Sequence, residues 1–228
     1  MSATFSLHHH PLDPPSRRVR LALAEKNIPF ETVVEKPWDP RPDYLAMSPA
    51  GDVPTLVIED GEGKIVLSDA TAICEYLEET QEGPSLLGPD PQARAEVRRL
   101  IYWFEYKMYH ESTALIVGEK AIKRLQGGGE PDSVLLRTGY YNIHGYLDYI
   151  GWLTERRNWL AGEQITLADM AAAGQVSAID YLNEVPWEKH PHAKEWYARI
   201  KSRPCFRLLL GDHIPGLLPH KNYANLDF

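Results

Sequence analysis

The side chains best able to do chemistry near the start of the chain are those of Asp13 and Ser16. They lie in the segment Asp13-Pro14-Pro15-Ser16, just before apolar residues at helical spacing, so Asp13 is predicted to be the N-cap of a helix. If a thiol were to bind beside Asp13, an ionised carboxylate could not donate a hydrogen bond to its sulfur, and the negative charge would raise the pKa of the thiol. A serine hydroxyl could act as a donor, but for Ser16 we favour an ordinary first-turn residue that bonds local backbone.

Three consecutive histidines, His8, His9 and His10, form a second group. On a strand, His8 and His10 would share one face and could both reach a metal ion. No cluster of cysteines or carboxylates completes a ligand set, so no metal site and no cofactor are expected. We interpret the three histidines as a polar loop at a domain boundary.

The other reactive side chains have structural interpretations. Cys74 lies among apolar residues of an expected helix and is predicted to pack in the core. Cys205 is the only other cysteine, which leaves no disulfide framework and suits a reducing, cytoplasmic compartment. Arg17, Arg18 and Arg20 are interpreted as a solvated helix face paired with nearby acidic residues.

Charge is distributed unevenly along the 228 residues. The chain has 24 Lys and Arg against 32 Asp and Glu, a net charge of −8. Residues 1–85 hold 7 basic and 15 acidic side chains, so the excess negative charge belongs to the first third. Phosphate binding requires a basic face, which makes nucleic acid an unfavourable partner. No run of about 18 apolar residues occurs, so no direct membrane insertion is expected.

Strand and helix signals alternate in the first third of the chain. Helices are expected after Asp13 and after Ser68 or Asp69. Strands are expected at residues 3–7, 30–34, 55–58 and 65–67, of which the last two form a hairpin. This order predicts an α/β domain over residues 1–80.

The remainder of the chain is predicted to be helical. Residues 81–91 are rich in Gly and Pro and are interpreted as a linker. An all-α domain is expected over residues 92–210, with the capping-box spacing of Thr166 and Asp169 at the start of one helix. Residues 211–228 lack periodicity and are predicted to form an extended C-terminal extension.

Four motifs in this order make the chain resemble the glutathione transferase family over residues 3–210. They are the segment 49–56 with Val53-Pro54, the helix start at 68–77 with Asp69 and Ala70, the box formed by 159–162 with 166–169, and Trp196-Tyr197 with Arg203-Pro204. The resemblance implies a thioredoxin-like α/β N-terminal domain, an all-α C-terminal domain and a homodimer. A cis bond at Val53-Pro54 would present the Val53 backbone to an extended peptide.

The resemblance also implies a chemistry whose residues are altered in this chain. Family enzymes stabilise the glutathione thiolate with a hydroxyl or thiol donor, and Asp13 stands at the position that matches the family's Cys. Asp52 replaces a common Lys or Gln, and Ala70 replaces a Ser, whereas Asp69 keeps the acidic partner of the peptide's ammonium group. Losing one contact and adding a like charge weakens glutathione binding by about 2–4 kcal/mol. We therefore expect a vestigial glutathione site at Asp13, Asp52, Val53, Asp69 and Ala70, with weak or absent glutathione binding.

Two features have no role in such an enzyme. Trp38 is set among three prolines, which stiffen the loop and present the indole at a low entropic cost, although Trp38 could equally cover the domain's own core. The chain ends in Leu226-Asp227-Phe228, where apolar groups lie beside negative charge. We predict that Trp38, Leu226, Asp227 and Phe228 bind a protein partner.

These features resemble a non-catalytic bacterial branch of the family. Its members are dimers that bind filaments of the tubulin homologue FtsZ and affect filament curvature and stability during cell division. The resemblance implies a non-enzymatic, cytoplasmic protein at the division site whose partners are FtsZ filaments and a second copy of itself. The alternative is a glutathione S-transferase or a glutathione-dependent isomerase that uses Ser16.

Overall fold

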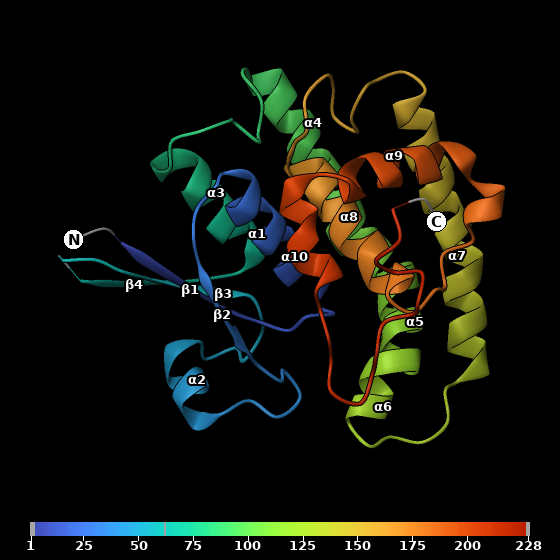
Figure 1. Cartoon of the computed structure of the whole chain (residues 1–228), viewed down its shortest axis with the longest axis horizontal. Coiled ribbons are helices and arrows are strands. Elements are labelled where there is room, and N and C mark those ends of the chain that lie inside the picture. Colours follow the sequence, from blue (N-terminus) through green and yellow to red (C-terminus); the bar gives the residue numbers. More distant parts are fainter. Residues whose placement is uncertain (1–2, 62, 227–228) are drawn as a thin grey trace.

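A computed structural model describes residues 3–61 and 63–226 of the chain. The first part holds β1 (Thr4–His9), α1 (Pro14–Glu25), β2 (Glu31–Val34), α2 (Pro42–Met47), β3 (Thr55–Glu59), β4 (Lys64–Ser68) and α3 (Ala70–Thr80). The strands and the two predicted helices match the expectation, whereas the short helix α2 was not predicted. A four-stranded sheet and a separate group of helices lie side by side, as Figure 1 shows.

The sheet has the strand order β2-β1-β3-β4. Strand β1 is parallel to β2 and antiparallel to β3, and β3 and β4 form the predicted hairpin. Leu7 of β1 lies opposite Leu56 of β3, and neither side chain is exposed to solvent. Helices α1 and α3 contribute Leu21 and Ile73 to the same core.

The second part is helical, as predicted. Its elements are α4 (Pro91–Tyr102), η1 (Trp103–Thr113), α5 (Ala114–Val117), η2 (Gly118–Ile122), α6 (Lys123–Leu125), α7 (Ser133–Thr154), α8 (Leu167–Asp180), η3 (Trp187–Lys189), α9 (Pro191–Lys201), η4 (Pro204–Phe206) and α10 (Arg207–Leu210). The segments η1 and η2 are π-helical, with wider turns than the α-helices on either side. No helix within the described residues is both long enough and apolar enough to cross a bilayer.

Helix α8 is the centre of the molecule, because every one of its residues is buried. The predicted capping box is present: Thr166 Oγ1 accepts from the amide of Ala168, and Asp169 accepts from the amide of Thr166. Gly174 lets α8 approach α1 closely, since a Cβ at this position would lie 2.6 Å from the carbonyl oxygen of Pro14. The two domains are therefore joined by close helix packing.

Two predictions about the N-terminal polar residues are wrong. His8 and His9 belong to β1 instead of a loop, and the side chains of His9 and His10 are buried. The helix that carries Arg17, Arg18 and Arg20 is covered by the C-terminal domain, so these three side chains are at most 5% exposed. Burial of three guanidinium groups requires partners, and acidic residues of the second domain supply them.

Both cysteines pack in the interior. Cys74 is buried on α3, as predicted, and Cys205 is buried in η4. Burial raises the pKa of each thiol to about 12. Neither thiol is therefore available as a thiolate near neutral pH.

Candidate functional site

A cleft of about 730 Å³ lies between the two domains. One wall comes from the segments that follow β1 and precede β3 and α3, and the other comes from η1 and α5. The lining includes carboxylate side chains from both walls, namely Asp13, Asp52, Asp69 and Glu105. No Lys or Arg side chain is among the described residues that line it.

Asp13 is the N-cap of α1, as predicted, and its Oδ2 accepts a hydrogen bond of 2.7 Å from the amide of Ser16. Removal from water, aided by the negative charges of Glu105 and Asp52 and opposed by hydrogen bonds from Ser16, raises the pKa of this carboxyl to about 7. The carboxyl can therefore hold a proton near neutral pH. In its ionised form it would oppose a thiolate in the same cleft.

Ser16 does not line the cleft. Its side chain is completely buried and interacts with the carboxyl of Asp13, whose pKa it lowers. The hydroxyl groups that do line the cleft include those of Tyr109 and Thr113. Sequence reasoning missed both as site residues, although their spacing of four along one helix places them on the same face.

The remaining predicted residues of the vestigial site come together on the wall of the sheet domain. Asp52, Val53, Asp69 and Ala70 all line the cleft, and the peptide bond between Val53 and Pro54 is cis, as predicted. Asp69 has a φ of 78°, and its side chain caps α3 by accepting from the amides of Thr71 and Ala72. The cis bond and the acidic helix cap thus both lie beside the cleft.

Trp38 also lines the cleft and is partly exposed. Its ring meets the ring of His10 edge-on, with centroids 5.1 Å apart. Burial, together with the charge of Arg17, lowers the pKa of His10 to about 4, so this contact involves a neutral imidazole at pH 7. The indole of Trp38 is therefore partly exposed and partly packed against the ring of His10.

The C-terminal extension is docked through most of its described length. Tyr223 is buried, whereas Leu226 is exposed; Asp227 and Phe228 lie outside the described residues. Tyr181 of α8 holds the extension by donating to the carbonyl of Leu217 and by accepting from the amide of Ile214. The proximal part is thus packed on the helical domain.

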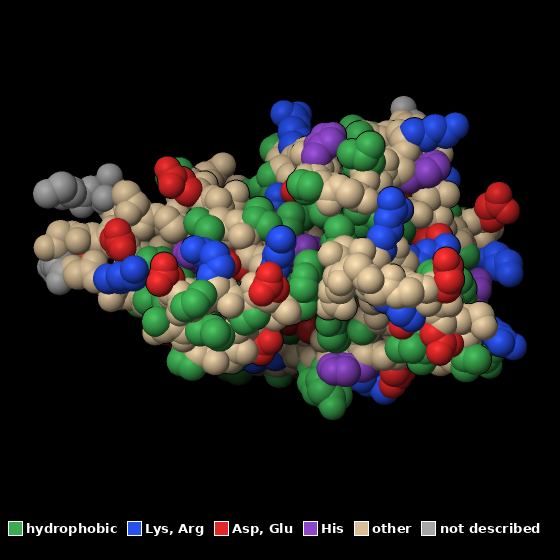
Figure 2. All heavy atoms as spheres, turned by 90° about the horizontal axis from the view of Figure 1, so that it is seen from below, with side chains coloured by type: hydrophobic (Ala, Val, Ile, Leu, Met, Phe, Trp, Pro, Cys, Tyr) green, Lys and Arg blue, Asp and Glu red, His purple; other side chains and the backbone are tan. Residues whose placement is uncertain are grey.

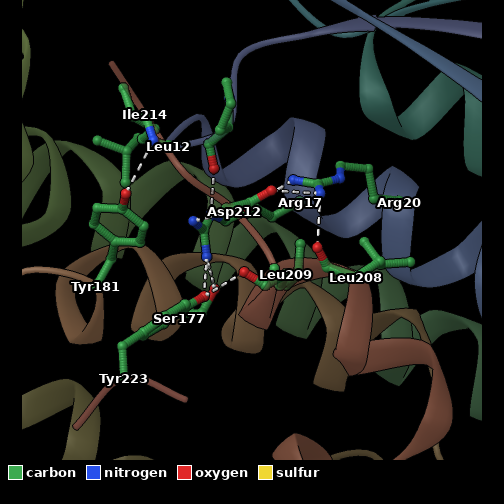
Figure 3. A network of polar contacts seen from close by, with 12 residues as sticks. Leu12, Arg17, Arg20, Ser177, Tyr181, Leu208, Leu209, Asp212, Ile214 and Tyr223 are labelled. Atoms are coloured by element: carbon green, nitrogen blue, oxygen red, sulfur yellow. Dashed lines mark hydrogen bonds and ion pairs between the residues drawn. The ribbon is translucent and has the colours of Figure 1, made fainter. Parts of the chain in front are cut away.

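A buried network connects the extension to α1, as Figure 3 shows. Arg20 makes two hydrogen bonds of 2.9 and 2.7 Å to the carboxylate of Asp212. Arg17 donates to Ser177 and Tyr223 and lies 3.4 Å from Asp212. These contacts explain how the arginines are accommodated away from water.

Two tyrosines near the junction of α4 and η1 are exposed. Tyr102 and Tyr106 are more than half exposed and stack on each other with centroids 5.1 Å apart. Tyr109 instead faces the cleft.

On the molecular face shown in Figure 2, basic and acidic side chains are interspersed, and no broad basic patch covers it.

No group of three potential metal-ligating side chains occurs within residues 3–61 and 63–226. His8 Nδ1 instead lies 2.8 Å from Glu35 Oε1, and His10 Nδ1 accepts from the amide of Leu12. The consecutive histidines therefore have roles in the sheet domain itself.

Comparison with known proteins bears on this geometry. The model of the glutathione S-transferase N-terminal domain matches residues 14–80, and that of the C-terminal domain matches residues 142–204. A solved structure of a glutathione S-transferase from Rhodospirillum rubrum is 51% identical, covers 99% of this chain and 100% of that one, and gives a TM-score of 0.95. The chain belongs to the glutathione S-transferase family.

Another relative is similar to this chain over its whole length. FtsZ-localized protein A of Caulobacter vibrioides is 46% identical over 228 residues, which are 100% of both chains. A solved structure titled FzlA from C. crescentus has a TM-score of 0.96 and 45% identity, and covers 99% of this chain and 100% of that one. The similarity therefore includes the C-terminal extension, which the two family models do not reach.

Proposed function

We propose that this chain is a non-enzymatic protein of bacterial cell division that binds FtsZ filaments as a homodimer and regulates their curvature and stability. It acts in the cytoplasm at the division site and needs no cofactor. The similarity to FtsZ-localized protein A across both full chains carries the proposal. That relative's name states an association with FtsZ, and the alignment covers the whole of this chain, including the extension.

The cleft supports a binding function over a catalytic one. A transferase must stabilise a thiolate, whereas Asp13 brings a carboxylate to the expected position and Ser16 is buried away from the cleft. Asp52 lines the same cleft and adds a second negative charge, which would repel an anionic peptide. Glutathione binding is accordingly weak or absent.

Trp38 and the end of the chain are the proposed contact sites for the filament. Trp38 presents a large, partly exposed ring on a loop that contains three prolines. A homodimer holds two copies of each site, so it can contact two subunits of one filament at a high effective concentration. Leu226, Asp227 and Phe228 complete the proposed contact.

Co-sedimentation with FtsZ filaments tests this proposal. Trp38→Ala and Asp227→Lys should each abolish pelleting of the chain with filaments, while the melting temperature stays close to that of the parent protein. Tyr141→Ala, which removes an aromatic side chain that is 81% exposed, and Glu188→Lys, which reverses an exposed charge, are matched controls and should still pellet. If both Trp38→Ala and Asp227→Lys pellet normally, the proposed sites are wrong.

A second candidate function is that of a glutathione S-transferase or a glutathione-dependent isomerase using Ser16. The observation in its favour is the retained cis bond at Val53-Pro54, together with the cap formed by Asp69 beside the cleft. Calorimetry with glutathione and a turnover assay with chlorodinitrobenzene distinguish the two functions. Tight binding with turnover that is lost in Ser16→Ala would establish the enzyme and reject the non-enzymatic proposal.

A further inference from the structure

The charge of the cleft is opposite to that expected for a site that binds an anionic peptide. Its described lining contains Asp13, Asp52, Asp69 and Glu105, and no Lys or Arg. Glu105 alone among the four has a cationic partner, the buried Arg18, whose Nε lies 2.9 Å from Glu105 Oε1. Arg18 and the amides at the starts of α1 and α3, which Asp13 and Asp69 accept from, offset only part of this charge, so the lining stays negative above the pKa of Asp13.

The four carboxylates lie close enough to influence each other across the cleft. Glu105 and Asp52 both act on the carboxyl of Asp13, and Asp69 acts on that of Glu105. In each case, the neighbouring negative charge raises the pKa of the affected carboxyl. A cation bound between them would relieve this repulsion.

A separate observation on the helical wall also indicates a ligand. Thr113 lines the cleft, and its side chain is completely buried. Its Oγ1 has no hydrogen-bond partner among the described residues. A buried hydroxyl without a partner is unfavourable, so a donor or acceptor supplied by a ligand would satisfy it.

The rest of the lining is suited to an organic ligand. Apolar side chains of Leu12, Pro54, Val117 and Ile122 contribute to the walls, as does Trp38 in the loop after β2. The volume of about 730 Å³ falls within the range of small-molecule sites, roughly 300–1,000 Å³. Because several carboxylates lie apart along the lining, the cleft favours a ligand with more than one positive charge on an apolar stem.

We propose that this cleft binds a linear organic polyamine, whose ammonium groups pair with Asp13, Asp52, Asp69 and Glu105. The methylene stem lies against the apolar wall, and an ammonium N–H can donate to Thr113 Oγ1. This inference is independent of the proposed contact with FtsZ filaments, because either activity can exist without the other.

Titration calorimetry of the full chain with spermidine, at pH 8 and low salt, tests the inference. Saturable binding is expected, and the triple variant Asp13→Asn, Asp52→Asn, Asp69→Asn should raise the Kd by at least about tenfold. Asparagine keeps both helix caps and tolerates the left-handed backbone at position 69, so folding should be preserved. Asp132→Asn, which alters the exposed cap of α7 outside the cleft, is the matched control and should bind like the parent.

Three outcomes would overturn the inference. They are the absence of binding by the parent protein, equal loss in Asp132→Asn and the triple variant, and equal occupation by magnesium chloride at the same concentration. If the triple variant unfolds, the single variant Asp52→Asn decides, because Asp52 is exposed and caps no helix.

Thr113→Val provides an independent measurement of the same site. Removal of an unpartnered buried hydroxyl should leave the melting temperature unchanged or higher. Spermidine affinity should nevertheless fall several-fold if the ligand bonds to Thr113 Oγ1. Unchanged affinity would contradict the placement of an ammonium group at this hydroxyl.

Discussion

Arg17 and Tyr223 are separated by 206 positions in the sequence, yet Arg17 Nη1 donates a hydrogen bond of 2.9 Å to the hydroxyl of Tyr223. Both side chains are buried, so the extension is attached to the first helix of the sheet domain through a charge-assisted bond. Tyr223 Oη also lies 3.3 Å from the carbonyl of Leu209, to which it donates. The extension is thus part of the contact between the two domains.

Tyr223→Phe should lower the free energy of unfolding by about 1.5–3 kcal/mol, because Arg17 loses one acceptor while the ring still fills its site. Chemical denaturation measures this difference. Tyr141→Phe removes an exposed hydroxyl and should change stability by less than about 0.5 kcal/mol. Equal effects in the two variants would show that the contact with Arg17 contributes nothing.

Asp212→Asn should be more severe. Arg20 makes two hydrogen bonds to this carboxylate and Arg17 lies beside it, so two buried guanidinium groups would lose their counter-ion. Breaking a buried ion pair from one side costs about 3–5 kcal/mol. The matched control is Glu59→Gln, whose pair with Lys64 is exposed and should cost at most about 1 kcal/mol. If Asp212→Asn and Glu59→Gln shifted the denaturation midpoint by similar amounts, this ranking would be contradicted.

His10→Asn should reduce the acid sensitivity of the fold. Burial lowers the pKa of His10 to about 4 from an ordinary 6.5, so the unfolded chain binds more protons between these values. Stability is therefore fully present above pH 6.5 and falls toward pH 4, by up to about 1.4 kcal/mol per pH unit for this histidine. The variant should remove that slope in denaturation curves measured at pH 7 and pH 5. An Asn oxygen can still accept from the amide of Leu12. A parallel pH dependence in both proteins would argue against a neutral, buried His10.

Asp13 should affect the pH dependence of stability in the direction opposite to His10, and Asp13→Asn tests this. The folded-state pKa of about 7 exceeds the ordinary 3.8, so the folded chain binds more protons and its stability falls as the pH rises from about 4 to 7. The variant keeps the cap of α1 without the charge, and should melt several degrees higher at pH 8 but like the parent at pH 4. Asp132→Asn changes an exposed cap, so its effect should not differ between these two pH values.

Local sequence signals were sufficient for much of the fold. The caps at Asp13, Asp69 and Thr166 and the β-hairpin depend on neighbouring residues, and each is present in the structure. The cis bond before Pro54, which is also present, was expected from the resemblance to a family. The lining position of Trp38 followed from the resemblance to a family, since the loop after the second strand edges the cleft there.

Features set by distant contacts could not be predicted in the same way. Arg17, Arg18 and Arg20 have the composition of a solvated face, and only α8 and the extension reveal that they are covered. Tyr109 and Thr113 belong to a helix of the second domain, and no spacing within that helix indicates that the sheet domain lies opposite. The full set of acidic residues in the cleft could not be predicted either, because the two domains contribute them from opposite walls.

The ion pair between Glu105 and Arg18 has a consequence for the whole molecule. Glu105 faces the cleft, while Arg18 is buried in α1 and also donates to Thr71 of α3. A cation that attracts Glu105 competes with Arg18, so occupancy of the cleft and adhesion of the two domains are thermodynamically linked. By reciprocity, the bound cation changes the equilibrium constant for contact between the domains by the same factor by which that contact changes the affinity for the cation.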